Sequence, residues 1–279
     1  MRLFKVVVAC LTAVMLAMPL TSCGKAASKE SVGSKAASEE SVSSKEAPKK
    51  FVVGFDNEFP PMGFVDKDGS YAGFDLDLAQ ECAKRLGMEY VAQPIAWDSK
   101  DNELKSGNIS CIWNGFTITE ERKSQYEWTS AYMKNQQVVV VKNDSAVKGL
   151  ADLAGLKVCV QKDSSGLEAV EGKPELKATF KELVQVDSYL NAMMELESGS
   201  VDAIVMDEIV ARYEIQTSGK PFKVLDESIS AEEYGVGFLK GNTQLRDKVQ
   251  KTLEEMAKDG TMAKISQKWF GSDVTTIGK

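Results

Sequence analysis

Short runs of β-branched and aromatic residues alternate with stretches of helical periodicity through most of this 279-residue chain. The strand-like runs are residues 51–55, 90–92, 109–113, 138–141, 157–160, 203–206 and 235–239. Apolar residues at helical spacing lie between or after them, at 74–86, 167–170, 189–197 and 245–256. In the first of these stretches Asp75 is predicted to cap a helix that stops at Gly87. The alternation predicts an α/β fold with largely parallel sheets.

The run 138–141 consists of four valines, which predicts a strand with both faces buried. We interpret it as a parallel-type strand or as a crossover between two lobes. At roughly 150 residues per domain, a chain of this length is expected to form two domains or lobes.

Charge and composition exclude several classes of function. The formal net charge is −7, so nucleic acid is not an expected partner. Histidine is absent, which excludes Ser-His-Asp and Cys-His nucleophile systems and the usual histidine-containing zinc sites.

The first 22 residues have the pattern of a secretion signal. Arg2 and Lys5 precede an apolar run at 6–18 that is too short to cross a bilayer comfortably. The run ends at Leu20-Thr-Ser-Cys23, which resembles a bacterial lipobox, so 1–22 is predicted to be a lipoprotein signal peptide and Cys23 to be lipidated. The alternative is a plain signal peptide with a chance cysteine. Residues 23–50 contain no large apolar side chain and are predicted to be a lipidated cysteine followed by a flexible tether.

Three cysteines remain once Cys10 and Cys23 are set aside, namely Cys82, Cys111 and Cys159. Each lies in an apolar pattern, which favours buried thiols. A disulfide between two of them is left open by the sequence.

Polar and aromatic residues follow the predicted strands, where ligands bind in open α/β sheets. They are Asp56, Phe59, Asn114, Gly115, Thr117, Arg122, Gln161, Ser164, Ser165 and Asp207. The set contains no nucleophile paired with a base, so its composition indicates recognition rather than catalysis.

Several motifs occur in the order typical of one family. They are Val53-Gly-Phe-Asp56, Phe59-Pro-Pro61, Gly73-Phe-Asp-Leu-Asp77, Leu104-Lys-Ser-Gly107, Thr117-Ile-Thr-Glu-Glu-Arg122, Leu153-Ala-Gly-Leu-Lys-Val158, Val201-Asp-Ala203 with Asp207, and Lys268-Trp-Phe-Gly271. Together they make residues 51–273 resemble the bacterial extracellular solute-binding proteins that serve polar amino-acid ABC importers.

The resemblance implies a two-lobed, type II periplasmic-binding-protein-like fold that closes on its ligand. Lobe 1 would comprise 51–136 plus 234–279, lobe 2 would comprise 137–233, and two crossover strands would join them. The expected partners are a free amino acid, the transmembrane subunits of an ABC permease and, through the lipid anchor, the cell membrane. The protein would be an extracytoplasmic monomer without cofactor or metal, and it would not be an enzyme.

The resemblance also assigns roles to the groups that would hold the ligand's α-carbon substituents. Arg122 would bind the α-carboxylate, for which its planar fork is suited, and Asp207 would bind the α-ammonium. Further contacts would come from Asn114, Gly115, Thr117, Ser164 and Ser165. The structural alternatives are a helix-surface arginine at 122 and a helix N-cap at Asp207.

Four residues would surround the ligand's side chain by resemblance. Phe59 and Trp97 would form apolar walls, Gln161 would contact a polar tip, and Asp56 would face a polar or cationic group. Asp56 could equally form a turn, and Trp97 could belong to the core. A polar amino acid is predicted, with basic ones ahead of cystine-like ones.

The chain departs from the family pattern at Ser110, usually Asp, and at Asp163, usually Gly. The second departure puts negative charge and a side chain beside the predicted carboxylate site. Two other functions stay open at this stage: a dehydratase-like enzyme on the same scaffold, and a ligand sensor.

Overall fold

The structure, a computed structural model, describes residues 49–279. The predicted signal peptide, Cys23 and nearly all of the tether lie outside the described residues. Among the described residues, no helix is long and apolar enough to cross a membrane.

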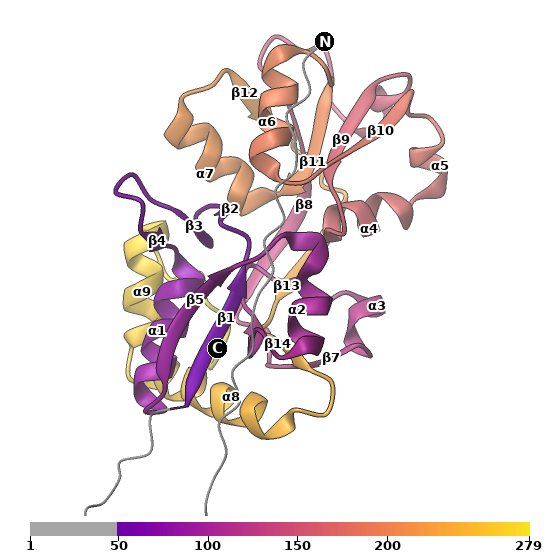
Figure 1. The fold of residues 1–279 in the computed structure, drawn as a ribbon. Helices are drawn as coiled ribbons and strands as arrows, with labels where there is room; N and C mark the ends of the chain where they lie inside the picture. Colours follow the sequence, from indigo (N-terminus) through magenta and orange to yellow (C-terminus); the bar gives the residue numbers. More distant parts are fainter. Residues whose placement is uncertain (1–48) are drawn as a thin grey trace, which may run out of the picture. The chain divides into compact units, whose positions relative to one another are not determined.

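The first sheet is mixed, with strand order β5-β1-β6-β14-β7 (Figure 1). Its strands are β1 (Lys50–Phe55), β5 (Glu89–Pro94), β6 (Cys111–Ile112), β7 (Tyr126–Trp128) and β14 (Gly237–Leu239). The other elements of this part are the small sheet β2 (Glu58–Phe59), β3 (Gly63–Val65) and β4 (Tyr71–Ala72), the 3-10 turn η1 (Trp97–Ser99), and α1 (Phe74–Arg85), α2 (Lys100–Ser106), α3 (Glu120–Lys123), α8 (Thr243–Lys258) and α9 (Thr261–Phe270). We call these elements lobe 1.

The second sheet has the order β10-β9-β11-β8-β12, and β13 also pairs with β8. Its strands are β8 (Met133–Lys142), β9 (Lys157–Gln161), β10 (Glu182–Val186), β11 (Ala203–Asp207), β12 (Phe222–Val224) and β13 (Ser230–Tyr234). The remaining elements are η2 (Leu150–Leu153), α4 (Ser165–Glu171), α5 (Pro174–Lys177), α6 (Tyr189–Ser198) and α7 (Glu208–Ser218). We call these elements lobe 2. The prediction of an α/β fold is therefore confirmed, but that of largely parallel sheets is wrong, because β8 and β14 pair antiparallel with their neighbours.

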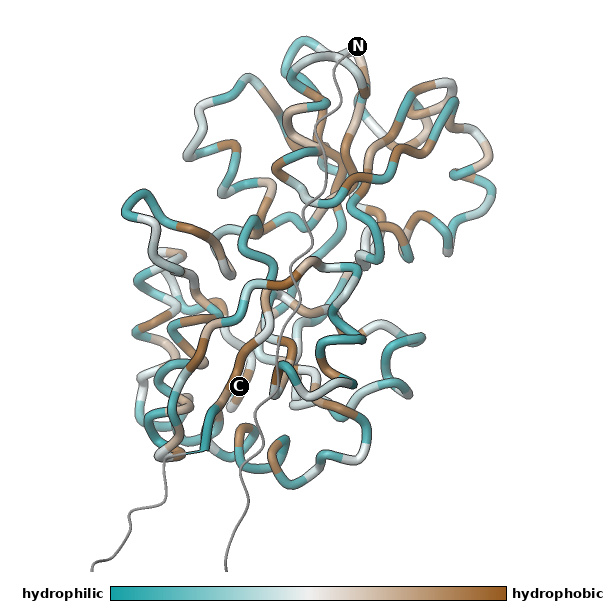
Figure 2. The backbone as a smooth tube through the Cα atoms, viewed as in Figure 1, coloured by the Kyte–Doolittle hydropathy of each residue, from teal (hydrophilic) through white to brown (hydrophobic). Residues whose placement is uncertain are grey.

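The valine run in β8 is buried on both faces, as predicted, but its direction is not parallel. Val138 and Val140 belong to one apolar cluster, and Val139 and Val141 belong to another. Figure 2 shows hydrophobic colouring along the central strands of the lobe 2 sheet. All of the partners of β8, namely β11, β12 and β13, run antiparallel to it. An apolar run indicates that both faces of a strand are buried, but it does not indicate whether the neighbouring strands run parallel or antiparallel to it. The interpretation of 138–141 as a parallel-type strand was therefore wrong.

Strands β8 and β13 connect the two sheets. They pair antiparallel from Ser230 opposite Gln137 to Tyr234 opposite Met133. At the lobe 1 end, isolated bridges join Thr117 to Tyr234 and Met133 to Thr275. The boundaries expected at 137 and 233 fall inside these strands.

Asp75 does not cap α1, which begins after Gly73 without a side-chain cap. Its buried carboxylate instead accepts hydrogen bonds from the Gly115 backbone N–H (2.6 Å) and the Tyr132 hydroxyl (2.8 Å). Desolvation raises the pKa of Asp75 to about 7. Asp75 therefore fixes the loop after β6, which carries several predicted ligand contacts. The strands predicted at 109–113 and 235–239 are shorter, at 111–112 and 237–239.

The three cysteines of the described residues, Cys82, Cys111 and Cys159, are buried and free. The prediction of buried thiols is confirmed. Ser110, the first departure from the family pattern, accepts a hydrogen bond from the Val52 backbone N–H through its hydroxyl (3.0 Å) and so ties β1 to the start of β6.

Candidate ligand-binding site

The predicted ligand contacts come together where the two lobes meet. They follow β1, β5, β6, β9 and β11, so the end of each of these strands positions at least one of them. The polar members are as buried as the core: Asn114 is 1% exposed, Arg122 4% and Asp207 3%. These polar side chains are therefore buried between the lobes and shielded from water. Their hydrogen-bond partners there decide what they can bind.

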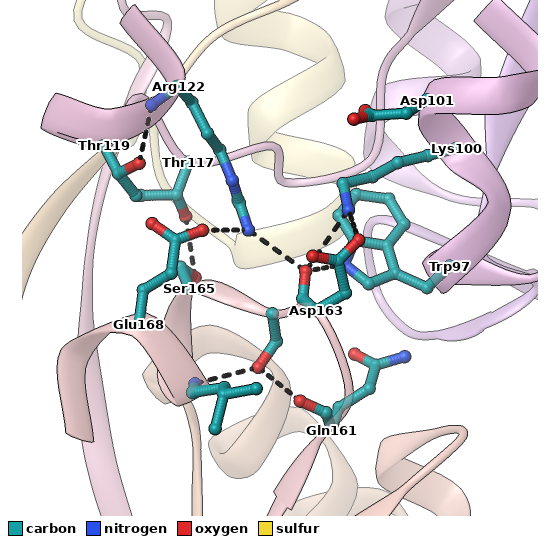
Figure 3. A network of polar contacts seen from close by, with 12 residues as sticks. Trp97, Lys100, Asp101, Thr117, Thr119, Arg122, Gln161, Asp163, Ser165 and Glu168 are labelled. Carbon is teal, nitrogen blue, oxygen red and sulfur yellow. Dashed lines mark hydrogen bonds and ion pairs between the residues drawn. The ribbon is translucent and has the colours of Figure 1, made fainter. Parts of the chain in front are cut away.

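Arg122 lies inside the site and not on a helix surface. Its helix, α3, is capped by Thr119, whose hydroxyl accepts a hydrogen bond from the Arg122 backbone N–H (3.2 Å). The guanidinium lies 5.1 Å from the centre of the Phe116 ring and points toward lobe 2 (Figure 3). There it donates to the Asp163 carbonyl (3.1 Å) and pairs with the Glu168 carboxylate. A carboxylate from the protein thus occupies the arginine to which the resemblance assigns the ligand's carboxylate.

Asp163 adopts the left-handed conformation, with φ of 54°, which explains why a glycine is usual at this position. Aspartate is one of the few other residues that tolerate this region. Its carbonyl accepts hydrogen bonds from Trp97 Nε1 (3.1 Å) and Lys100 Nζ (3.3 Å), and its carboxylate pairs with Lys100. Lys100 is 2% exposed, and burial lowers its pKa. The added negative charge therefore has a buried counter-ion on lobe 1.

Trp97 has more than the predicted apolar role. Its ring packs edge-on against Phe116, with centroids 5.6 Å apart, while its indole N–H crosses to lobe 2. Lys100 and Glu168 were missed by the sequence reasoning, because neither residue belongs to one of the quoted motifs and neither directly follows a strand. Figure 3 shows these residues converging on Asp163 and Arg122.

Ser164 and Ser165 have different positions within the site. Ser164 caps α4: its hydroxyl accepts a hydrogen bond from the Leu167 N–H (3.1 Å) and donates to the Gln161 carbonyl (2.8 Å). Ser165 faces lobe 1, where its hydroxyl lies 3.1 Å from Thr117 Oγ1. The Ser165 hydroxyl thus lies directly opposite Thr117, whereas the Ser164 hydroxyl is already engaged by its own loop.

Asp207 ends β11 and is the N-cap residue of α7, as the structural alternative predicted, but its side chain makes no capping hydrogen bond. One carboxylate oxygen accepts from Tyr234 OH (2.6 Å) and from Asn135 Nδ2 (2.8 Å). Burial raises the pKa of Asp207. No lysine or arginine among residues 49–279 pairs with it, so its charge is met by neutral donors alone.

Asp56 and Gln161 meet across the lobes, with Gln161 Nε2 donating to Asp56 Oδ2 (2.7 Å). The other oxygen of Asp56 accepts from the Glu58 N–H (2.9 Å), so the turn interpretation also holds. Burial raises the pKa of Asp56. A cavity of about 550 Å³ lies beside this pair, and its charged lining consists of Asp56, Glu58, Asp98, Lys162 and Asp187.

Phe59, Asn114 and Gly115 lie on the lobe 1 side of the candidate site. Gly115 has φ of 55°, and a Cβ there would lie 2.9 Å from the Phe59 ring. Phe59 packs against Tyr189 of lobe 2 at 5.8 Å between ring centroids. Neither amide atom of Asn114 has a hydrogen-bond partner within the described residues, although both are buried. Across residues 49–279, no group of three acidic or cysteine side chains is arranged to hold a metal ion.

Comparison with known proteins extends these observations. Residues 51–272 match the bacterial extracellular solute-binding proteins, family 3. The L-cystine-binding protein TcyJ of Escherichia coli K12 is 33% identical over 226 residues, which cover 80% of this chain and 84% of TcyJ. The arginine-binding extracellular protein ArtP of Bacillus subtilis is 29% identical over 263 residues, covering 93% and 96%.

A solved structure supports the same relationship. The substrate-binding protein of an ABC uptake transporter from Streptococcus pneumoniae, with bound histidine, is 38% identical. It superposes with a TM-score of 0.79 over 81% of this chain and 94% of its own. The two-lobed, type II periplasmic-binding-protein fold expected from the motifs is thus confirmed. The chain belongs to the bacterial extracellular solute-binding proteins, family 3.

Proposed function

We propose that this protein is the extracytoplasmic substrate-binding component of an ABC importer and that it binds a polar amino acid as a zwitterion between its lobes. The observation that carries the proposal is the pairing of Arg122 with Glu168 across the lobes. An arginine with a nearly fully buried side chain, already engaged by a carboxylate, is suited to exchange that partner for the carboxylate of a ligand.

The second half of the zwitterion would bind Asp207, the buried carboxylate that ends β11. An α-ammonium would supply the cation that Asp207 lacks among residues 49–279. Arg122 lies on lobe 1 and Asp207 on lobe 2. A ligand that joins them would therefore stabilise the closed state more than the open one, which is the requirement for a ligand to drive closure.

The charges around the cavity favour a cationic side chain. Four carboxylates line it, and its single cation, Lys162, pairs with Asp187 at 2.6 Å. Asp56, Glu58 and Asp98 make no ion pair within the described residues. A basic amino acid would place its cation near Asp56, which is why we place basic ligands ahead of the cystine bound by one relative and predict that neutral ligands bind more weakly.

The anchor and the partners complete the proposal. Cys23 would be lipidated and tether a monomer to the cell membrane, where it would deliver its ligand to permease subunits. The family is one of extracellular binding proteins, and the relatives named above are binding proteins rather than enzymes.

Calorimetric titration of the purified full chain with the twenty amino acids and cystine tests this function. We expect micromolar or tighter binding of at least one polar amino acid, and a basic one among the tightest. Recovery of the ligand unchanged, followed by NMR, distinguishes a binding protein from a dehydratase-like enzyme. No binding to any of these compounds would refute the proposal.

A further inference from the structure

Glu232 lies on the same face of the lobe 2 sheet as Asp207. Strand β8 runs between β11 and β13, with Asp207 opposite Gln137 and Glu232 opposite Asn135. Residues two apart on a strand share a face, and directly opposed residues share it as well. The register therefore gathers two carboxylates and two amides on one face, at the end of the sheet that meets lobe 1.

Hydrogen bonds hold the two carboxylates close together. Asn135 Nδ2 donates both to Asp207 Oδ1 (2.8 Å) and to Glu232 Oε2 (2.9 Å). The two oxygens can thus be no further apart than the sum of these distances. Glu232 Oε2 also accepts from Gln137 Nε2 (3.2 Å) and from Thr117 Oγ1 of lobe 1 (3.1 Å).

The donors around this pair are all neutral. Neither Asp207 nor Glu232 forms an ion pair with any lysine or arginine of residues 49–279. Desolvation, followed by the charge of Asp207, raises the pKa of Glu232 to about 7. Two neighbouring carboxylates in a desolvated site cannot both stay ionised without a cation.

Two further polar atoms point to the chemistry of the missing cation. Gln137 Oε1 and Tyr189 OH are buried and have no hydrogen-bond partner within the described residues. Both lie within 3.2 Å of the position that a Cβ on Gly166 would occupy, so they face the same small region of lobe 2. Burial raises the pKa of Tyr189, and the charges of Asp207 and Glu232 raise it further.

We infer that Glu232 acts with Asp207 as a two-carboxylate subsite for the ligand's α-ammonium group, which makes Glu232 a specificity-determining residue of this protein. The inference rests on the proposed amino-acid-binding function. An ammonium has three N–H donors, and Asp207, Glu232 and the free Gln137 Oε1 offer three acceptors from one face of the sheet. A ligand whose amino group is acylated would leave both carboxylates without a cation.

The subsite links ligand binding to pH. In the empty protein the pair holds a proton around neutral pH, and an incoming ammonium displaces it. The other titratable groups that face the pair are Tyr189 and Tyr234, and burial raises the pKa of each well above its ordinary value, so they stay protonated. Affinity should therefore fall as the pH decreases from 8 to 5.5, because more of Glu232 must lose its proton.

The test compares the full-length wild type with Glu232→Gln and, as a matched control, Glu233→Gln. Glu233 is the next residue on β13, is exposed and alternates to the other face of the sheet. L-arginine, L-histidine and L-cystine are titrated into the wild type at pH 8, and the tightest of them is used with each variant from pH 5.5 to 8.5. We expect Glu232→Gln to raise the Kd about 10- to 100-fold at pH 8, the effect of losing a hydrogen bond to a charged group. We also expect a nearly flat pH profile, while Glu233→Gln behaves as wild type.

A second measurement needs no variant. Titration of the wild type at pH 7 in two buffers of different ionisation enthalpy should show net release of protons on binding, because desolvation and the charge of Asp207 raise the pKa of Glu232 to about 7. Unchanged affinity with an unchanged pH profile in Glu232→Gln, or zero proton release in the wild type, would overturn the inference. Failure of the wild type to bind any of the twenty amino acids or cystine would instead overturn the proposed function, and the inference with it.

Discussion

Replacing Glu168 with glutamine should tighten ligand binding, because Glu168 occupies the arginine that the ligand's carboxylate needs. The Glu168 carboxylate pairs with Arg122 across the lobes. A ligand can bind Arg122 only by displacing it. Glutamine keeps the size of the side chain and removes the charge, so the competitor is weakened without opening a cavity.

The size of the effect follows from the burial of the two partners. A hydrogen bond to a charged group contributes about 1.5–3 kcal/mol when desolvated. The Arg122 side chain is 5% exposed, but that of Glu168 is 26% exposed, so solvent screens part of the pair. We therefore expect about 1–2 kcal/mol, which corresponds to a Kd roughly 5- to 30-fold lower in Glu168→Gln.

Two assays applied together distinguish competition from a supporting role. Calorimetry with the tightest amino acid measures the Kd, and small-angle scattering without ligand measures closure. We expect tighter binding and a more open empty protein, since a cross-lobe ion pair has been removed. The control is Glu171→Gln on the same helix, because Glu171 pairs with Lys177 inside lobe 2 (3.1 Å). An unchanged or higher Kd in Glu168→Gln would refute the competition.

Three further predictions test the roles assigned to the other residues. Arg122→Ala and Asp207→Ala should each weaken binding by roughly 2–5 kcal/mol in calorimetry, because the first leaves the ligand's carboxylate without its cation and the second removes one of the two carboxylates that hold its ammonium; near-wild-type affinity in either variant would remove that residue from the site. Asp56→Asn should weaken a basic ligand by about 1.5–3 kcal/mol and leave a neutral one nearly unchanged, and equal losses would mean that Asp56 only shapes its turn. Cys23→Ala should leave the protein unprocessed or release it to the medium, and an undiminished, processed membrane fraction would contradict lipidation.

Local sequence was sufficient to identify the groups that follow strands. Thr117 and Asp207 could be found because each lies within a few residues of a strand end, and Arg122 could be found because it completes the motif that begins at Thr117. Such a position is set by chain connectivity, and parallel strands bring their ends to one edge of a sheet. The two-lobed fold could be identified in the same way, because its motifs occur in order along the chain.

Several structural details were beyond the reach of the sequence pattern. The four valines of β8 predict burial on both faces, but the strand's antiparallel direction depends on pairing with segments up to 101 residues away, as for Met133 and Tyr234. Asp75 resembles a helix cap in sequence, yet it folds inward onto the Gly115 N–H, forty residues further on. In both cases the deciding partner is remote in the chain.

The sequence by itself determined the strand and helix segments, the family and the residue types at the strand ends, because these depend on periodicity and on short motifs. Tertiary structure alone decided which charges meet. Lys100 faces Asp163, Glu168 faces Arg122, and Glu232 lies beside Asp207 only through the approach of two lobes and the register of β13 on β8. Electrostatic contacts act over a few ångströms. The partners in these three pairs, however, are 25 to 63 positions apart in the sequence, and two of the three pairs join different lobes.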